Sequence, residues 1–143
     1  MNGSNSSDSN PSQVQGVCPS GWHLPSDSEW KYLEIHLGMS LFEADGLEYR
    51  GTDEGGKLKE AGLEHWNTPN TGATNTSGFS ALAGGWRHRA GAFTNLGSYA
   101  VIWTATEYST TEGWHRNLES LTSQVYRNYY KKKGGFSVRC LRD

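Results

Sequence analysis

Hydrophobic residues recur with a helical period in one early segment of the chain. Trp30, Leu33 and Leu37 have the i, i+3, i+7 spacing of residues that share one helix face, and polar residues fill the positions between them. The residues SDSE at 26–29 match the capping box that begins many helices. This pattern predicts a helix over about residues 27–37.

A second, shorter helix is predicted around residues 53–61. Leu58 and Ala61 have the spacing to face inward together, although Gly55 and Gly56 disfavour a helix because glycine loses more backbone entropy than other residues.

Short β-like runs fill the second half of the chain. They follow a stretch at 67–78, NTPNTGATNTSG, whose turn-forming residues predict a long structured loop. The residues FSVRC at 136–140 alternate between apolar and polar, which is typical of a half-buried strand. A helix followed by a long loop and antiparallel strands is an α+β organisation. The β-like runs are residues 79–82, 85–89, 100–104, 114–118, 124–128 and 136–141.

Composition narrows this picture. The 143 residues suit one domain and include six Trp, seven Tyr and 18 Gly, which favours a loop-rich fold pinned by aromatic rings over a helical bundle. The net charge of −2 predicts no field that would recruit nucleic acid or insert the chain at an anionic membrane. No run of 18 apolar residues is present to span a bilayer.

The first 16 residues are almost wholly polar. Residues 1–16 contain mainly Ser, Asn, Gly and Gln, so they predict a flexible linker ahead of a domain at 17–143. They lack the charged and apolar regions of a signal peptide, and we expect them to belong to a longer exported protein with an extracellular or cell-surface location.

The two cysteines, Cys18 and Cys140, are 122 positions apart at the two ends of the predicted domain. They have neither the spacing nor the neighbouring histidines of a metal site. A disulfide between them is the favoured interpretation, since it would close nearly the whole domain. Two buried free thiols remain the alternative.

Several motifs in the expected order resemble a known family. They are CPSGWHLPSDSEW (18–30), GGKLKEAGLEHWNTPNTGATNTSGFSALAGGWRH (55–88), WTATEY (103–108) and GFSVRCLRD (135–143). Together they resemble the Fibrobacter succinogenes major paralogous domain over about residues 17–143. The GGW and GFS motifs also look like those of the formylglycine-generating sulfatase-modifying family. Both resemblances imply a C-type lectin-like fold with paired N- and C-terminal strands, one or two helices and a long loop-rich region that builds a binding face.

The end of the chain is also similar to the variable proteins of diversity-generating retroelements. These proteins share the implied fold and end in a strand like GFSVRC, which follows diversified positions. The residues YRNYY at 126–130 fit the set produced by randomised Asn codons. Lys131–Lys133, Trp86 and Trp114 do not fit that set.

Catalytic motifs are sparse. The resemblance to formylglycine-generating enzymes implies a copper-binding cysteine pair at the substrate groove, but residues 86–130 contain no cysteine. We therefore expect no enzyme activity, no cofactor and no metal site. His23 and His65 are expected to be structural. The carbohydrate-binding motifs of calcium-dependent lectins are absent, while a structural cation in the 67–78 loop stays open.

The remaining chemistry is that of a binding face. Tyr, Trp and Arg give large contact areas with polar tips, which suits recognition loops. The interpretation is a non-catalytic domain, monomeric in isolation, that binds a protein or carbohydrate ligand. The alternatives are a relative of the formylglycine-generating oxidase and a purely structural repeated envelope module. Trp103 is expected in the core, while Trp86 and Trp114 suit core and surface equally. The candidate ligand-binding residues are Trp86, Arg87, His88, Tyr99, Tyr108, Trp114, His115, Asn117, Tyr126, Asn128, Tyr129 and Tyr130.

Overall fold

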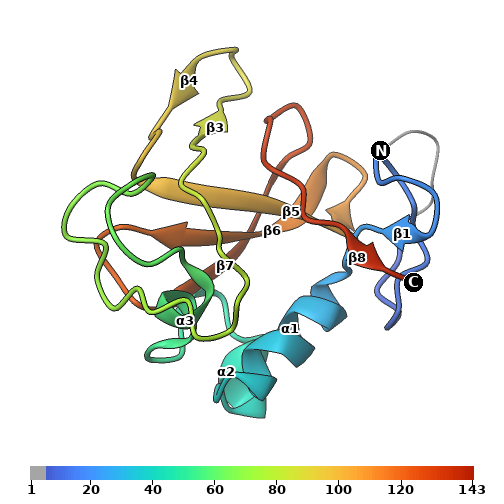
Figure 1. Cartoon of the computed structure of the whole chain (residues 1–143). Helices are drawn as coiled ribbons and strands as arrows, with labels where there is room; N and C mark the ends of the chain where they lie inside the picture. The colour runs from blue at the N-terminus through green and yellow to red at the C-terminus, as the bar shows by residue number, and fades with distance from the viewer. Residues whose placement is uncertain (1–5) are drawn as a thin grey trace.

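Eight strands and three short helices follow one another along residues 6–143, the part of the chain that the computed structural model describes (Figure 1). Helices mixed with antiparallel strands confirm the predicted α+β class, although the predicted number of helices was one or two. In chain order the elements are β1 (Trp22–His23), α1 (Asp27–His36), α2 (Leu41–Asp45), β2 (Glu48–Arg50), α3 (Glu54–Leu58), β3 (Trp86–Arg87), β4 (Phe93–Thr94), β5 (Tyr99–Ser109), β6 (Glu112–Glu119), β7 (Val125–Lys131) and β8 (Leu141–Arg142).

A four-stranded antiparallel sheet in the order β2-β7-β6-β5 forms the centre of the fold. Successive residues of a strand point to opposite sides, so each strand contributes to two faces. Ile102, Arg116 and Arg127 are register partners on the side of α1, which we name the helix face. Trp103 and His115 are partners on the opposite side, the hairpin face, over which the β3–β4 hairpin stands (Figure 1).

Helix α1 forms where the sequence predicts it. Ser26 is the N-cap, its hydroxyl accepts from the Glu29 N–H, and the Glu29 carboxylate accepts from the Ser26 N–H in return. These two bonds satisfy backbone donors that a helix start leaves free. The apolar side of α1 then buries Trp30 against the core, where Leu58 and Leu118 are fully buried.

The second predicted helix is shorter than expected. α3 covers Glu54–Leu58 and buries Leu58, but Ala61 lies beyond its end and is exposed, so the prediction for Ala61 is wrong. Gly55 and Gly56 are needed here for close approach. A Cβ on Gly55 would lie 2.2 Å from the Gln124 carbonyl oxygen, and the neighbouring glycine is equally crowded. α2 and β2 were not predicted at all.

Three predicted strand runs do not form strands of that length. The run at 85–89 contains only the two-residue strand β3. Residues 79–82 make only an isolated bridge, between Lys59 and Ala81. Residues 136–140 cross β5 instead of running along it: Ser137 pairs once with Ile102, and only Leu141–Arg142 are in a strand. The alternation in this segment was therefore misread.

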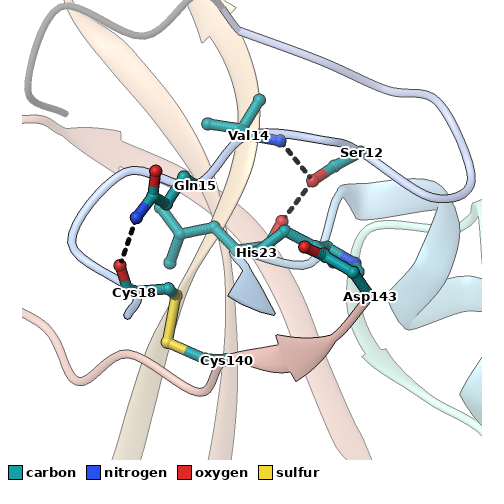
Figure 2. The surroundings of a disulfide bond; sticks show 8 residues. Ser12, Val14, Gln15, Cys18, His23, Cys140 and Asp143 are labelled. Carbon is teal, nitrogen blue, oxygen red and sulfur yellow. Dashed lines mark hydrogen bonds and ion pairs between the residues drawn. A yellow bond between two sulfur atoms is a disulfide. The ribbon is translucent and has the colours of Figure 1, made fainter. Parts of the chain in front are cut away.

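The two ends of the domain meet, as predicted. β1 and β8 pair antiparallel, with Trp22 opposite Arg142, and the Cys18–Cys140 disulfide lies beside them (Figure 2). The Cα atoms of the two cysteines are 5.9 Å apart and 122 positions separate them in the sequence. The disulfide thus joins the beginning and the end of the folded chain.

Part of the segment predicted as a linker packs on the domain. Val14 is buried and its carbonyl accepts from the Leu24 N–H at 2.8 Å, while the Ser12 hydroxyl donates to the Leu24 carbonyl. The Ser9 carbonyl accepts from the Ser26 hydroxyl at 2.7 Å. Residues 6–16 are therefore held by the domain, and residues 1–5 of the predicted linker lie outside the described residues.

A buried network of charges joins the helices to the helix face. The Arg116 Nη1 and Arg127 Nη2 atoms each donate to the Asp27 carboxylate at 2.6 Å. Arg116 Nε and both terminal nitrogens of Arg50 donate to Glu34. Burial raises the pKa of Asp27, but the two guanidinium groups outweigh that effect and hold the pKa well below its usual range. The network fixes α1 and β2 against β6 and β7.

Candidate functional site

A groove of about 380 Å³ lies on the hairpin face. β5, β6 and β7 form its floor, while the β3–β4 region and the segment after β7 form its walls. It is the place where the sheet, the hairpin and the last loop meet, three segments that are separate in sequence. Its lining residues are Trp86, Asn95, Tyr99, Val101, His115, Asn117, Tyr126, Asn128, Tyr129, Tyr130 and Phe136.

Strand alternation selects the polar floor. His115 and Asn117 are two residues apart on β6, so both project to the hairpin face, while Arg116 between them projects to the helix face. On β7 the same rule places Tyr126 and Asn128 in the groove, where the Asn128 amide nitrogen donates to the Tyr126 hydroxyl at 2.8 Å.

Aromatic rings build the wall. The Trp86 ring packs edge-on against Tyr130 at 5.5 Å and against Phe136 at 5.9 Å, and the Phe136 ring lies 5.1 Å from His115. Gly85 gives Trp86 this position, since its φ is +64° and a Cβ there would lie only 2.4 Å from the carbonyl oxygen of the opposite strand. The GGW motif is thus the turn that brings the hairpin over the sheet.

Two buried polar atoms in the floor have no partner. His115 and Asn117 are only 7% and 6% exposed. Within residues 6–143, His115 Nδ1 and Asn117 Oδ1 have no hydrogen-bond partner. Burial lowers the pKa of His115, with help from the nearby Arg116 charge, to about 4, so its imidazole is neutral at pH 7. Leaving a buried polar group unsatisfied costs about 1–3 kcal/mol, which makes two such atoms in one groove informative.

The far end of the floor is a satisfied polar cluster. The Glu119 Oε1 atom accepts from the Asn117 amide nitrogen at 2.8 Å and from the Tyr49 hydroxyl at 2.7 Å. Burial first, and the Glu119 carboxylate second, raise the pKa of Tyr49 well above its usual range. These bonds hold the Asn117 amide so that its oxygen is the atom left without a partner.

The groove brings together most of the candidate residues predicted from the sequence. Eight of the twelve line it, although they come from four different elements or element ends. They are Trp86, Tyr99, His115, Asn117, Tyr126, Asn128, Tyr129 and Tyr130.

The other four candidates lie elsewhere. His88 is at the rim, with its ring 5.6 Å from Trp86, and Arg87 is exposed on the hairpin. Trp114 alternates to the helix face, where the Arg127 guanidinium lies 3.9 Å above its ring. Tyr108 stacks at 3.7 Å on Tyr129 on that same side, so Tyr129 borders the groove while its ring lies on the helix face.

Sequence reasoning missed three lining residues. Asn95 and Val101 were not singled out, and Phe136 was assigned to a strand. The Trp103 ring, expected in the core, is half-buried on the hairpin face and stacks on Phe136 at 4.1 Å. The period of two that a strand gives Tyr99, Val101 and Trp103 was the signal that could have placed all three on one face.

Other polar clusters are structural or exposed. The Lys59 Nζ atom donates to the carbonyl oxygens of Thr71, Glu119 and Thr122 at 2.8–2.9 Å, so this lysine ties the 67–78 loop to the segment between β6 and β7. Glu60, Glu64 and His65 lie close together at the surface. The Glu60 carboxylate and the Nδ1 atom of the His65 ring form a hydrogen bond of 2.9 Å. In the described part of the chain no helix has the length and hydrophobicity to cross a membrane.

Comparison with known families agrees with the motifs. The family model described as Fibrobacter succinogenes major domain matches residues 5–142. The chain belongs to this family. The match begins within the segment predicted as a linker and includes β1, β8 and every residue of the groove. No curated protein and no solved structure matches the chain.

Proposed function

We propose that this domain is a non-catalytic recognition module and that the groove is its ligand site. The observation that carries the proposal is the pair of buried side chains His115 and Asn117, which line an aromatic groove and each have one polar atom without a partner among residues 6–143. A ligand that bonds to them gains hydrogen bonds whose protein side is already desolvated and positioned. A groove with aromatic walls and few fixed polar groups is typical of ligand sites.

The surroundings of the groove support a target larger than the groove itself. Phe93 is 83% exposed and Leu96 is 77% exposed on the hairpin beside it. Exposed apolar residues next to a polar and aromatic site are typical of an interaction surface. The target we propose is a protein or glycan on another cell or surface, with this domain displayed outside its own cell.

We further propose that the fold is C-type lectin-like and that the site is diversified as in retroelement variable proteins. Paired terminal strands, an early helix and the long region between α3 and β5 support the fold assignment. Tyr126, Asn128 and Tyr130 support diversification, since they alternate along β7 on the hairpin face, away from the buried network.

The alternatives are less well supported. Oxidase chemistry of the formylglycine-generating type needs free thiols, whereas Cys18 and Cys140 are joined in the disulfide. A basic nucleic-acid surface is disfavoured because Lys131 and Lys132 each pair with a glutamate across the sheet. A monomer remains our expectation for the isolated domain.

The test is to probe the purified domain against a phage-displayed peptide library and a glycan array. The domain should select a ligand whose binding falls at least tenfold in Tyr126→Ala and in Tyr130→Ala. Tyr32→Ala is the matched control, because that tyrosine is exposed on α1, away from the groove, and its loss should leave the affinity unchanged. Undiminished binding in both groove variants would show that recognition occurs elsewhere.

A further inference from the structure

The groove has a charge property that restricts its ligand. Among the described residues, the eleven that line it carry no formal charge at pH 7, since the His115 imidazole is neutral there. A charged ligand group entering this site would lose its hydration without gaining an opposite charge, which is costly. The lining thus favours a ligand that is neutral where it contacts the floor.

The polar side chains that line the groove can both donate and accept hydrogen bonds. Asn95, Asn117 and Asn128 each offer amide donors and an amide acceptor, and the tyrosine hydroxyls both donate and accept. The neutral His115 ring has one donor nitrogen and one acceptor nitrogen. Hydroxyl groups on a ligand match this lining best, because each hydroxyl can donate to Asn117 Oδ1 and can either donate to or accept from the unpartnered His115 nitrogen.

The spacing of His115 and Asn117 along β6 calls for more than one ligand group. His115 and Asn117 are two residues apart on one face of β6, so their Cα atoms are separated by about 7 Å. The aromatic wall beside them is a T-shaped pair, Trp86 and Tyr130, with Phe136 tilted against Tyr130 at 5.4 Å. The ligand must therefore present several hydroxyl groups and also an apolar surface that packs on rings.

We infer that the groove binds a neutral saccharide. A sugar ring has hydroxyl groups around its edge and an apolar face of C–H bonds. One sugar unit can therefore form hydrogen bonds with the polar floor while the next unit packs against the Trp86 and Tyr130 rings. Asn117 Oδ1 accepts from one sugar hydroxyl, and His115 forms a hydrogen bond with another. This inference rests on the groove being the recognition site proposed above.

Recognition of this kind does not require calcium. Calcium needs six to eight oxygen ligands, usually with carboxylates among them. Among the described residues no carboxylate lines the groove, and the nearby Glu119 already accepts hydrogen bonds from Asn117 and Tyr49 through Oε1. Saccharide binding should therefore be the same in calcium and in EDTA.

The experiment compares neutral and acidic glycans on one array, with calcium or EDTA, beside the peptide library. Neutral glycans should bind in both buffers, and glycans ending in sialic or uronic acid should bind at least tenfold more weakly. His115→Phe and Asn117→Leu should each weaken neutral-glycan binding at least tenfold. The melting temperature of His115→Phe should stay at or above that of wild type. His36→Phe, an exposed histidine on α1, is the matched control.

The outcomes separate the two proposals. Preferential binding of acidic glycans, or loss of binding in EDTA, overturns the saccharide inference. A peptide ligand lost in the same two groove variants, with no glycan bound, also overturns it but supports the recognition site. If neither library yields a ligand that depends on the groove, both the saccharide inference and the proposed function are wrong.

Discussion

Replacing His115 with phenylalanine should stabilise the fold. The His115 side chain is 7% exposed and its Nδ1 atom has no partner in residues 6–143, whereas Trp103, Tyr126 and Phe136 surround the ring. Phenylalanine keeps the ring and removes the unsatisfied nitrogen, whose burial costs about 1–3 kcal/mol. With an unfolding entropy of about 2.1 cal/mol/K per residue over 143 residues, each kcal/mol corresponds to about 3 °C. A rise in Tm of about 3–10 °C at pH 7 is the expected result.

The gain should grow as the solution becomes acidic. The pKa of His115 is lowered to about 4 in the folded state, against an ordinary value of 6.5. Between these values the unfolded chain binds a proton that the folded chain does not, so wild-type stability falls as the pH drops from 6.5 to 4, by about 3 kcal/mol from this group. His115→Phe lacks that loss, and thermal unfolding at pH 7 and pH 4.5 measures it as a widening difference in Tm.

The control and the refuting result are clear. His36→Phe changes an exposed histidine and should shift the Tm by less than about 2 °C at either pH. If His115→Phe instead lowers the Tm at pH 7, the imidazole has a structural hydrogen bond. The unpartnered nitrogen would then not mark a ligand site.

Three further predictions concern the rest of the fold. Replacing Cys18 and Cys140 together by alanine should lower the free energy of unfolding in urea by about 3–5 kcal/mol, because the disulfide closes a loop with a separation of 122 positions; no change would mean that the unfolded chain is not restrained by it. Arg116→Leu should lower the free energy of unfolding by about 3–5 kcal/mol, because the buried Asp27 and Glu34 carboxylates each lose a partner. The surface variant Lys132→Ala should lower it by less than about 1 kcal/mol, and equal losses in the two variants would contradict this. Burial acts to lower the pKa of His23, but the hydrogen bonds and charges of the Glu29 and Asp143 carboxylates outweigh burial and raise the pKa. His23 therefore stabilises the fold fully below pH 6.5, and this stabilisation is lost as the pH rises through the folded pKa. His23→Gln should remove this pH dependence from the urea midpoints, and an unchanged pH dependence would refute the assignment.

Local signals explain which elements could be predicted. The capping box at Ser26 and the spacing of Trp30 and Leu33 act within one helix, and the structure contains that helix almost residue for residue. The central strands were also placed, because alternation and turn residues are local. The predicted disulfide formed because its cysteines lie beside the two terminal strands.

Long-range contacts explain the errors. Gly55 and Gly56 disfavour a helix locally, yet their lack of a side chain is what lets α3 approach the backbone near Gly72 and Gln124. Similarly, nothing within 136–140 shows that Ser137 meets β5 at a single point. Local periodicity has no information about such contacts, so α3 was only partly predicted and the last strand was overextended.

The candidate site shows the same division. Residue type singled out most of the aromatic and amide side chains that line the groove, but only strand register separates His115 in the groove from Trp114 on the helix face. Phe136 reached the groove through a loop crossing, which no pattern in the sequence indicated. The residue types that line the groove were therefore predictable, whereas the exact set of lining residues required the pairing of the strands.

The alternation along β7 makes a final prediction about which positions can vary. Val125 and Arg127 project to the helix face, where Val125 is fully buried and Arg127 bonds to Asp27 in the charge network. Tyr126 and Asn128 project to the groove, and the hydrogen bond that they share is with each other. A library randomised at 126, 128 and 130 should therefore keep most members folded, whereas randomising 125 and 127 should unfold most of them. Protease resistance of the two libraries on the yeast surface measures this. Equal surviving fractions would show that the groove side of β7 is itself part of the core, and the proposed separation of a fixed helix face from a variable recognition face would then be wrong.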